Sequence, residues 1–509
     1  MEYQVEYQVE YQEIAAHDLA SQAEAVCKDG KYTITAMFAN DERCINGHFI
    51  IYCIFAGEGI FKGLRAVFKS DEGLGFPSLT PAFPSTAWYE REIHDLFGLV
   101  PIGHPDLRRL VLHENWPLER YPLRKDFAMD THVPEDNVSY PMVSVHGDGV
   151  FEVPVGPIHA GIIEPGHFRF SQAGEQIINV DAKLFFTHRG IEKGVEGMPI
   201  ELATYRAERI CGACSVSHGI SYAQAIEGMA HIEIPQQAQY IRGLVGELER
   251  LYNHVGDIGN LCAGLGFAVG ASHGSRLKEL LMRLNERVTG SRFLRGMVIP
   301  GGVSLNITPQ ISQEIQQTCD KLAEEFVDLM ELLHDNNAFL DRVNGTGILT
   351  RKAALDLGVV GVAARASGID RDLRRDHAYS IYKNLKFTVP IQTSGDVAAR
   401  LWLRADEVEQ SLQMIRQIIQ NMPGRQGGLK IDIPKIKPYS SGLGYSESAR
   451  GSNLHWLMVG ENNTIYRYAV RSASYPNWIA VTVACPGNII SDFPLINKSF
   501  ELCYACLDR

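Results

Sequence analysis

The sequence predicts an α+β fold, in which a small N-terminal α/β domain precedes a mainly helical domain with a central helix bundle. Two patterns carry this prediction: short strand-like apolar runs gather before residue 70, and long segments of helical periodicity follow residue 236. The chain has 509 residues, 45% of them apolar and 21% charged, which is typical of a folded protein of several domains.

The first domain is expected to span residues 1–126. Three apolar runs, 32–38, 49–55 and 64–68, are separated by turns that contain Gly or Asp, as in strands of one sheet. An amphipathic stretch over 88–98 follows, and its last residue is a glycine that suits a helix end. Before these elements, Val5-Glu6-Tyr7-Gln8 recurs as Val9-Glu10-Tyr11-Gln12, for which we expect a frayed strand or a short helix.

Residues 127–150 are predicted to form a linker, because they contain Asp and Pro without clear periodicity. Residues 151–509 form the second domain. Its long helices are predicted at 236–262, 275–293, 309–343 and 402–421. Thr308 and Pro309 suit a helix start as N-cap and first helical residue. Residues 442–488 are richer in turns and short strands.

Charge and hydropathy exclude several classes of protein. Lys and Arg number 48 and Asp and Glu 60, so the formal net charge is −12, which argues against a nucleic-acid binder. No apolar run approaches ~18 residues, so we expect no transmembrane segment. The polar start Met1-Glu2-Tyr3-Gln4 does not resemble a signal peptide, and we therefore expect a cytoplasmic protein.

Four of the ten cysteines form two C-x-x-C pairs, Cys211/Cys214 and Cys503/Cys506. Each pair places two thiolates on one side of a metal, and four thiolates select zinc, an iron–sulfur cluster or another soft metal. A zinc ribbon joins its pairs by roughly 15–20 residues, so the long stretch between these pairs disfavours it. The two pairs are therefore predicted to form one shared metal site. Two separate redox dithiols remain the alternative.

A resemblance becomes specific at these pairs. The pattern Arg209-x-Cys211-x-x-Cys214-x-x-x-His218, together with Cys503-x-x-Cys506, resembles the large subunit of [NiFe] hydrogenases. Residues 90–126, which begin Glu-Arg-Glu and end Pro-Leu-Arg-Lys-Asp, resemble the 30-kDa-type subunit of respiratory complex I. The fusion of the two, with a 49-kDa-type second domain, resembles the complex-I-related group 4 [NiFe] hydrogenases of the formate hydrogenlyase type.

The resemblance implies a NiFe(CO)(CN)2 centre and interconversion of H2 with protons and electrons. Cys211 and Cys503 would be terminal nickel ligands, whereas Cys214 and Cys506 would bridge nickel to an iron that carries CO and cyanide. Iron–sulfur clusters are expected only in partner subunits, because no further cysteine cluster stands in the sequence.

Three more residues match functional positions of the family. Glu164 matches the glutamate that transfers protons, a task suited to a carboxyl group whose pKa burial moves toward the working range. Arg450 resembles the arginine held over the open face of the metals, and its guanidinium stays charged at all working pH values. His218, four residues after Cys214, is expected on the same helix face, where it can donate a hydrogen bond to a thiolate.

The sequence also departs from the family pattern near the expected metals. Glu501-Leu502 stands where the family has Asp-Pro before the last cysteine pair, and Ala449 replaces a proline before Arg450. The acidic position in the helix after the first pair corresponds to Asn253. The sequence ends at Arg509, three residues past Cys506, and by resemblance we expect a processed, metal-loaded form.

The resemblance also implies partners: a hydrogenase small subunit with a [4Fe-4S] cluster, a ferredoxin-like subunit and membrane-arm subunits. The protein would then lie on the inner face of the cytoplasmic membrane as a peripheral part of the complex. The alternative function is a non-catalytic or quinone-reducing coupling subunit like those of complex I. The N-terminal domain is expected to supply a docking surface and internal ion pairs from the charged residues Glu90, Arg91, Asp95, Asp106, Arg108 and Arg109.

Overall fold

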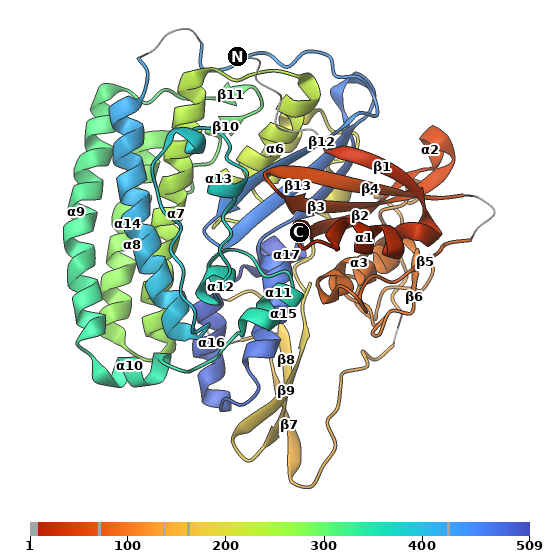
Figure 1. Ribbon diagram of the computed structural model, residues 1–509, viewed down its shortest axis with the longest axis horizontal. Helices are drawn as coiled ribbons and strands as arrows, with labels where there is room; N and C mark the ends of the chain where they lie inside the picture. The colour runs from red at the N-terminus through yellow and green to blue at the C-terminus, as the bar shows by residue number, and fades with distance from the viewer. Residues whose placement is uncertain (1–8, 70–72, 137, 160–162, 425–427) are drawn as a thin grey trace.

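The computed structural model describes residues 9–69, 73–136, 138–159, 163–424 and 428–509. It confirms the expected combination of a small N-terminal sheet region with a mainly helical remainder. Figure 1 shows the helix bundle on the left and the N-terminal sheet on the right, with a second sheet and the C-terminal helices between them. Among the described residues, no helix is both long and apolar enough to span a membrane.

The N-terminal region is built on a four-stranded sheet with the order β1-β4-β3-β2. The strands are β1 (Glu10–Ala15), β2 (Thr33–Glu42), β3 (His48–Gly57) and β4 (Ile60–Phe68), and only β1 and β4 pair in parallel. The three predicted strands are thus confirmed. The second copy of the tyrosine-containing repeat enters β1, while the first copy lies outside the described residues.

Helix α3 (Ala87–Phe97) packs on this sheet beside β2. It ends where the sequence predicts, because Gly98 adopts a left-handed conformation (φ 70°) and its N–H donates to the carbonyl of His94 at 2.9 Å. The smaller elements of this region are η1 (Ala16–Asp18), α1 (Leu19–Cys27), α2 (Arg43–Asn46), β5 (Gly75–Pro77), η2 (Pro84–Thr86) and β6 (Val100–Ile102).

No helix or strand occurs between residues 103 and 149 in the part of the chain that the structure describes. The prediction that 127–150 connects two domains, 1–126 and 151–509, stays a prediction. An antiparallel sheet follows, made of β7 (Val150–Val155), β8 (His167–Ala173) and β9 (Gln176–Lys183). It projects from the lower end of the molecule in Figure 1.

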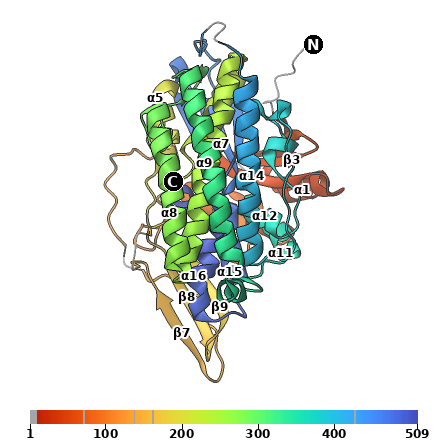
Figure 2. The ribbon, with the colours of Figure 1, turned by 90° about the vertical axis from the view of Figure 1, so that its left-hand side faces the viewer.

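The central bundle consists of four long helices, which stand side by side in Figure 2. They are α7 (Gln236–Gly264), α8 (Ala268–Thr289), α9 (Pro309–His334) and α14 (Val397–Asn421). Thr308 caps α9 as predicted, since its side chain accepts the N–H of Ile311. The predicted helix over 309–343 is broken, because Asn336 leaves the helical conformation and its side chain caps α10 (Asn337–Val343).

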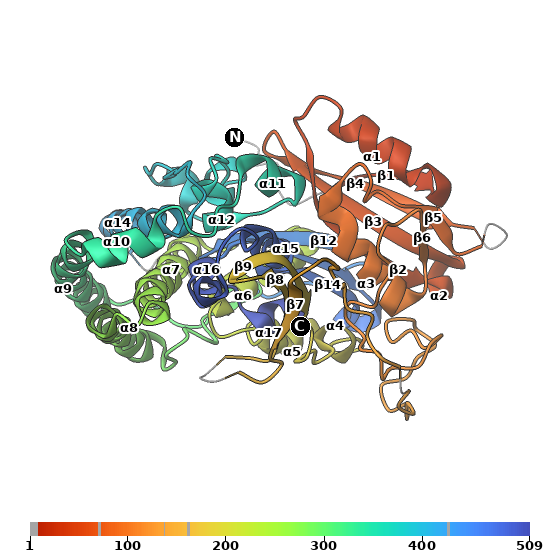
Figure 3. The same ribbon diagram turned by 90° about the horizontal axis from the view of Figure 1, so that it is seen from below.

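A second sheet contains β12 (Ser441–Ser448), β13 (Gly451–Val459) and β14 (Ile465–Arg471), all antiparallel. Helix α6 (Ser215–Ala230) packs on β12 and β13. The N-terminal sheet meets this sheet at Trp456, whose ring lies 4.9 Å from that of Phe38 and 4.7 Å from that of Tyr52. Figure 3, seen from below, shows the C-terminal helices between the bundle and the N-terminal sheet.

The remaining helices and short strands complete the fold. They are α4 (Ile191–Gly194), α5 (Ile200–Ala207), β10 (Val298–Ile299), β11 (Gly302–Val303), α11 (Arg351–Asp356), α12 (Gly361–Ala366), α13 (Leu373–Asp376), η3 (Tyr382–Asn384), η4 (Glu461–Asn463), α15 (Ser474–Ala484), η5 (Ile490–Asp492), α16 (Phe493–Phe500) and α17 (Tyr504–Asp508).

Candidate metal centre

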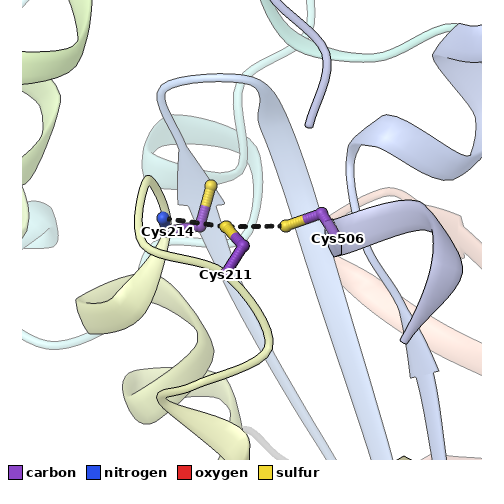
Figure 4. A group of neighbouring side chains, drawn as sticks. All are labelled: Cys211, Cys214 and Cys506. Carbon is purple, nitrogen blue, oxygen red and sulfur yellow. Dashed lines mark hydrogen bonds between the residues drawn. The ribbon is translucent and has the colours of Figure 1, made fainter. Parts of the chain in front are cut away.

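The two C-x-x-C pairs, far apart in the sequence, meet in space. The sulfur atoms of Cys211, Cys214 and Cys506 all lie within 4.8 Å of one another, and all three residues are buried. Figure 4 shows Cys211 between the other two, with its Sγ 3.0 Å from the Sγ of Cys506. Cys503 is not part of this group of three and is only partly buried, although it caps the helix that carries Cys506.

Both pairs are held by helix starts. Cys214 is the N-cap residue of α6, and its N–H donates to Cys211 Sγ at 3.2 Å. Cys503 is the N-cap residue of α17, and its Sγ accepts the N–H of Cys506 at 3.4 Å. Hydrogen bonding with Cys211 lowers the pKa of both the Cys214 and the Cys503 thiols. Anionic sulfur at a helix N-terminus is stabilised by free N–H groups. Hydrogen bonding among the cysteines raises the pKa of Cys211 and Cys506, so one cysteine of each pair favours the thiolate form.

The donor set is all sulfur, since the group contains no carboxylate and no imidazole among the described residues. Thiolates prefer soft metals over the hard cations that carboxylates bind. The residues present therefore fit a thiolate-bound nickel–iron pair.

His218 lies in α6 and is fully buried. Its Nε2 is 3.2 Å from Cys506 Sγ, so the imidazole contacts the second cysteine pair. Its other nitrogen, Nδ1, lies 2.8 Å from Nε2 of His455, a residue of β13. Sequence reasoning did not find His455, because nothing in its local pattern of apolar neighbours marks it.

Arg450 occupies the two-residue turn between β12 and β13. Its guanidinium forms a two-pronged ion pair with Asp257 of α7, in which Nη2 lies 2.9 Å from Oδ1. Burial alone would raise the pKa of Asp257, but Arg450 and Arg404 hold it well below its usual value. The carboxylate that orients Arg450 therefore stays ionised.

Asp257 and Asn253 lie one helical turn apart on α7. Asn253, which the sequence aligned with the family's acidic position, instead donates through Nδ2 to the carbonyl of Ala213 at 2.7 Å. Its amide thus holds the loop of the first cysteine pair, while Asp257, four residues later on the same helix, pairs with Arg450.

Glu164 reaches the second cysteine pair through the backbone. Its Oε2 accepts the N–H of Ala505 at 2.7 Å, between Cys503 and Cys506. The side chain is only partly buried, yet burial raises its pKa above the ordinary value, and the neighbouring Cys503 raises it further. The carboxyl group therefore touches the metal-binding segment while retaining access toward the surface.

Two further acids stand close to the centre. Glu249 of α7, which sequence reasoning missed, accepts the N–H groups of Val216 (2.6 Å) and Ser217 (3.0 Å) at the start of α6. Burial and the charge of Cys214 raise its pKa to about 8. Glu501, at the C-cap of α16, accepts from Asn260 at 2.6 Å, and burial together with Asp257 raises its pKa to about 7.

The charged residues of the N-terminal region turn inward. Glu90 is fully buried and accepts the N–H of Leu79 at 2.5 Å, and Asp95 accepts the N–H groups of residues 110–112. Arg91 donates to the carbonyls of Arg108 and Arg109. These three side chains organise loops inside the region, and at these positions the structure offers no docking surface.

Comparison with known proteins gives matches along nearly the whole chain. The profile described as "Respiratory-chain NADH dehydrogenase, 49 Kd subunit" matches residues 265–443 and 436–509, and its 30 Kd counterpart matches 12–133. The profile "Nickel-dependent hydrogenase" matches residues 189–263, which contain the first cysteine pair.

Two similar curated proteins come from Escherichia coli K12. Hydrogenase-4 component G is 37% identical over 94% of this chain and 84% of its own length, and formate hydrogenlyase subunit 5 is 36% identical over the same shares. Among solved structures, a chain of the membrane-bound sulfane sulfur reductase, an archaeal respiratory membrane complex, superposes with a TM-score of 0.67 and 28% identity. That match covers 71% of this chain and 99% of the other.

Proposed function

Because the chain belongs to the family of complex-I-related [NiFe] hydrogenase large subunits, we propose that Cys211, Cys214, Cys503 and Cys506 together hold its nickel–iron centre. The protein is the catalytic subunit of a membrane-associated hydrogenase that interconverts H2 with protons and electrons. The observation that carries the proposed ligand set is the buried group of Cys211, Cys214 and Cys506, in which the second pair meets the first. When bound, the centre supplies the redox chemistry of H2 formation and oxidation.

We assign Cys211 and Cys503 to nickel and Cys214 and Cys506 to a bridge between nickel and an iron that carries CO and cyanide. Both assignments follow the resemblance in residue spacing. Their support here is that the two pairs are alike: in each, the Sγ of the first cysteine accepts the backbone N–H of the second.

Glu164 is the proposed proton carrier. Its Oε2 already accepts a hydrogen bond from the segment that bears Cys503 and Cys506. Burial and the neighbouring Cys503 raise the pKa of Glu164 above the ordinary carboxyl value, which suits a group that both takes and releases protons.

Arg450 is the proposed charged group over the centre. The Asp257 carboxylate fixes its guanidinium from behind with two hydrogen bonds, so the arginine cannot swing into solvent. A fixed positive charge beside buried thiolates offsets their negative charge. His218 is proposed to donate its Nε2–H to Cys506, which stabilises the thiolate and orients the ring.

We further propose that electrons leave through a small subunit with a [4Fe-4S] cluster and a ferredoxin-like subunit, and that these sit on membrane-arm subunits at the inner face of the cytoplasmic membrane. One support is that the described ranges contain a single group of residues with metal-ligand geometry. Its members come from the two cysteine pairs, which leaves no second group to hold an iron–sulfur cluster in these ranges. The N-terminal region, residues 1–126, is proposed to help fasten the catalytic part to these partners.

The test is an infrared spectrum of the anaerobically purified complex in the window where metal-bound CO and cyanide absorb. We expect bands from the wild-type complex and none from Cys503→Ala. Cys319→Ala, which removes a buried thiol from the outer bundle helix α9, is the matched control and should keep the bands. The wild-type complex must be folded, assembled and made with its maturation proteins present. If it then shows neither the infrared bands nor nickel, the proposed centre is contradicted.

A further inference from the structure

Three buried side chains form a hydrogen-bonded chain that ends on Cys506. His218 Nε2 lies 3.2 Å from Cys506 Sγ, His218 Nδ1 lies 2.8 Å from His455 Nε2, and His455 Nδ1 lies 2.7 Å from the hydroxyl of Tyr468. All three side chains are 0% exposed. They come from α6, β13 and β14. The fold thus brings together His218 and His455, which are 237 residues apart in the sequence.

The direction of this chain follows from its sulfur end. When Cys506 binds metal it is a thiolate without a proton, so it only accepts, and His218 must present Nε2–H to it. A neutral His218 then carries a lone pair on Nδ1, and His455 must donate its Nε2–H there. His455 in turn carries a lone pair on Nδ1, which needs a donor.

The tyrosine end gives the same direction independently. Burial raises the pKa of Tyr468 well above its ordinary value, so the hydroxyl keeps its proton and can donate it. Within the described part of the chain, His455 Nδ1 is the partner found for this hydroxyl. Burial also lowers the pKa of His455 well below its ordinary value, which leaves the ring neutral with one donor and one acceptor nitrogen.

We propose that His455 and Tyr468 are positioning residues, which fix His218 in the tautomer that directs its Nε2–H at Cys506. In the opposite tautomer, two N–H groups would face each other between the histidines, and a lone pair would face the thiolate. Successive hydrogen bonds also polarise one another in a buried site, so the chain strengthens the last N–H···S contact. This inference rests on the proposed role of Cys506 as a metal ligand.

Tyr468→Phe tests the chain with a matched control. It removes the terminal hydroxyl and keeps the ring. The control is Tyr222→Phe, because the Tyr222 ring packs edge-on at 5.8 Å from that of Tyr468, and its buried hydroxyl donates to the carbonyl of Ile200 at 2.7 Å, off the chain. Both variants lose one buried hydroxyl hydrogen bond in the same core.

The readouts are the CO and cyanide stretching frequencies and the nickel and iron content of each purified complex. We expect Tyr468→Phe to keep its metals and to shift the CO band to lower frequency, because a less strongly hydrogen-bonded thiolate donates more charge to iron. Tyr222→Phe should leave the band in place. Equal band positions in Tyr468→Phe and wild type, or an equal shift in both variants, would overturn the proposal.

A second pair of variants decides the question if Tyr468→Phe does not assemble. His455→Gln keeps an amide N–H that can donate to His218 Nδ1, whereas His455→Leu cannot donate. We expect the glutamine variant to have CO frequencies closer to wild type, and identical frequencies in both variants would overturn the proposal. Absence of bands from the wild-type complex would instead contradict the proposed centre, so the two failures are distinguishable.

Discussion

Glu90 and Asp95 in the N-terminal region and Glu407 and Asp372 in the helical region are similarly hidden from water, yet the pKa values of these two sets of acids move in opposite directions. Glu90 in α3 accepts from neutral groups, namely the hydroxyls of Ser78 and Thr80 and the N–H of Leu79. Burial raises its pKa despite these hydrogen bonds, and the same holds for Asp95. Neutral donors alone do not offset the loss of hydration there.

Glu407 and Asp372 pair with buried arginines instead. Glu407 in α14 lies 2.6 Å from the guanidinium of Arg365 and 2.7 Å from Nε2 of His254. Burial would raise its pKa, but Arg365 and His254 bring it well below the ordinary value. Full positive charges therefore decide the outcome in the bundle.

The bundle also shows where cations run short. Glu447 shares Arg365 with Glu407, and the nearby Asp372 adds negative charge. Burial and Asp372 together raise the pKa of Glu447 to about 7. Neutral donors are therefore enough where a buried acid only gathers loops, as Asp95 does. Near the centre, each buried acid that stays ionised requires an arginine of its own.

The largest expected effect is loss of a bundle acid. Glu407→Ala removes the carboxylate that pairs with both Arg365 and His254 and leaves Arg365 only Glu447 and Asp372, and breaking a buried pair in this way costs about 3–5 kcal/mol. Glu409→Ala, on the exposed side of the same helix, is the control and should change stability little. Chemical denaturation measures both, and equal stability of the two variants would break the contrast between the regions.

Asp257→Asn should have the next largest effect, because it removes the charge that holds Arg450 and Arg404. We expect a loss of about 3 kcal/mol, since the replacement amide still fills the space but leaves both guanidiniums without an anion. Hydrogenase activity should fall along with stability. Asn253→Asp sharpens the distinction: it loses the donor to Ala213 and should lower nickel content while Arg450 keeps its partner.

Asp95→Asn should lower the free energy of unfolding by less, about 1–2 kcal/mol. The amide oxygen can still accept some of the hydrogen bonds that the N–H groups of residues 110–112 donate. Thermal unfolding of the complex measures the change, and metal content and activity should stay at wild-type levels. A loss of nickel in this variant would show that the N-terminal acids act on the centre after all.

The smallest effect is the difference in pH dependence. The pKa of Asp95 is raised in the folded state, so its contribution to stability is present below the unfolded value of about 3.9 and is lost as pH rises through the folded pKa. Burial alone would raise the pKa of Asp372, but Arg374 and Arg365 lower it to about 2. The contribution of Asp372 to stability is therefore lost as pH falls from about 4 to 2.

Hydrogen exchange, corrected for its intrinsic pH dependence, reads these opposite slopes in one molecule. Protection of α3 should rise relative to α13, whose N-cap is Asp372, as pH decreases through the raised pKa of Asp95, and Asp95→Asn should flatten the slope of α3 alone. Parallel slopes for both helices in wild type and variant would contradict the assignment.

Much of the fold follows from local pattern. The strands of the first sheet, Gly98 at the end of α3 and Thr308 at the start of α9 were predicted, because turn residues, caps and periodicity are local signals. The break before α10 was not predicted, because the apolar repeat continues across Asn336 and only the observed cap interrupts it.

A cluster of four cysteines was predicted from spacing and resemblance, and the structure groups three of them, Cys211, Cys214 and Cys506, while the ligand set and the individual roles stay predictions. The surrounding residues were harder to find. Asp257 depends on how α7 is rotated against the turn that bears Arg450, and His455 depends on a partner in another element. Such partners are set by tertiary packing, which no single segment of sequence encodes.

Residues 503–509 carry a consequence for the order of folding. The carboxylate of Asp508 accepts the N–H groups of Phe185 and Thr187, and Arg509 pairs with both Glu92 in α3 and Glu192 in α4. Contacts between segments hundreds of residues apart form late, because a long loop must close first. We therefore expect the second cysteine pair to reach its place after both regions have folded, leaving the first pair accessible to incoming metal until that final docking.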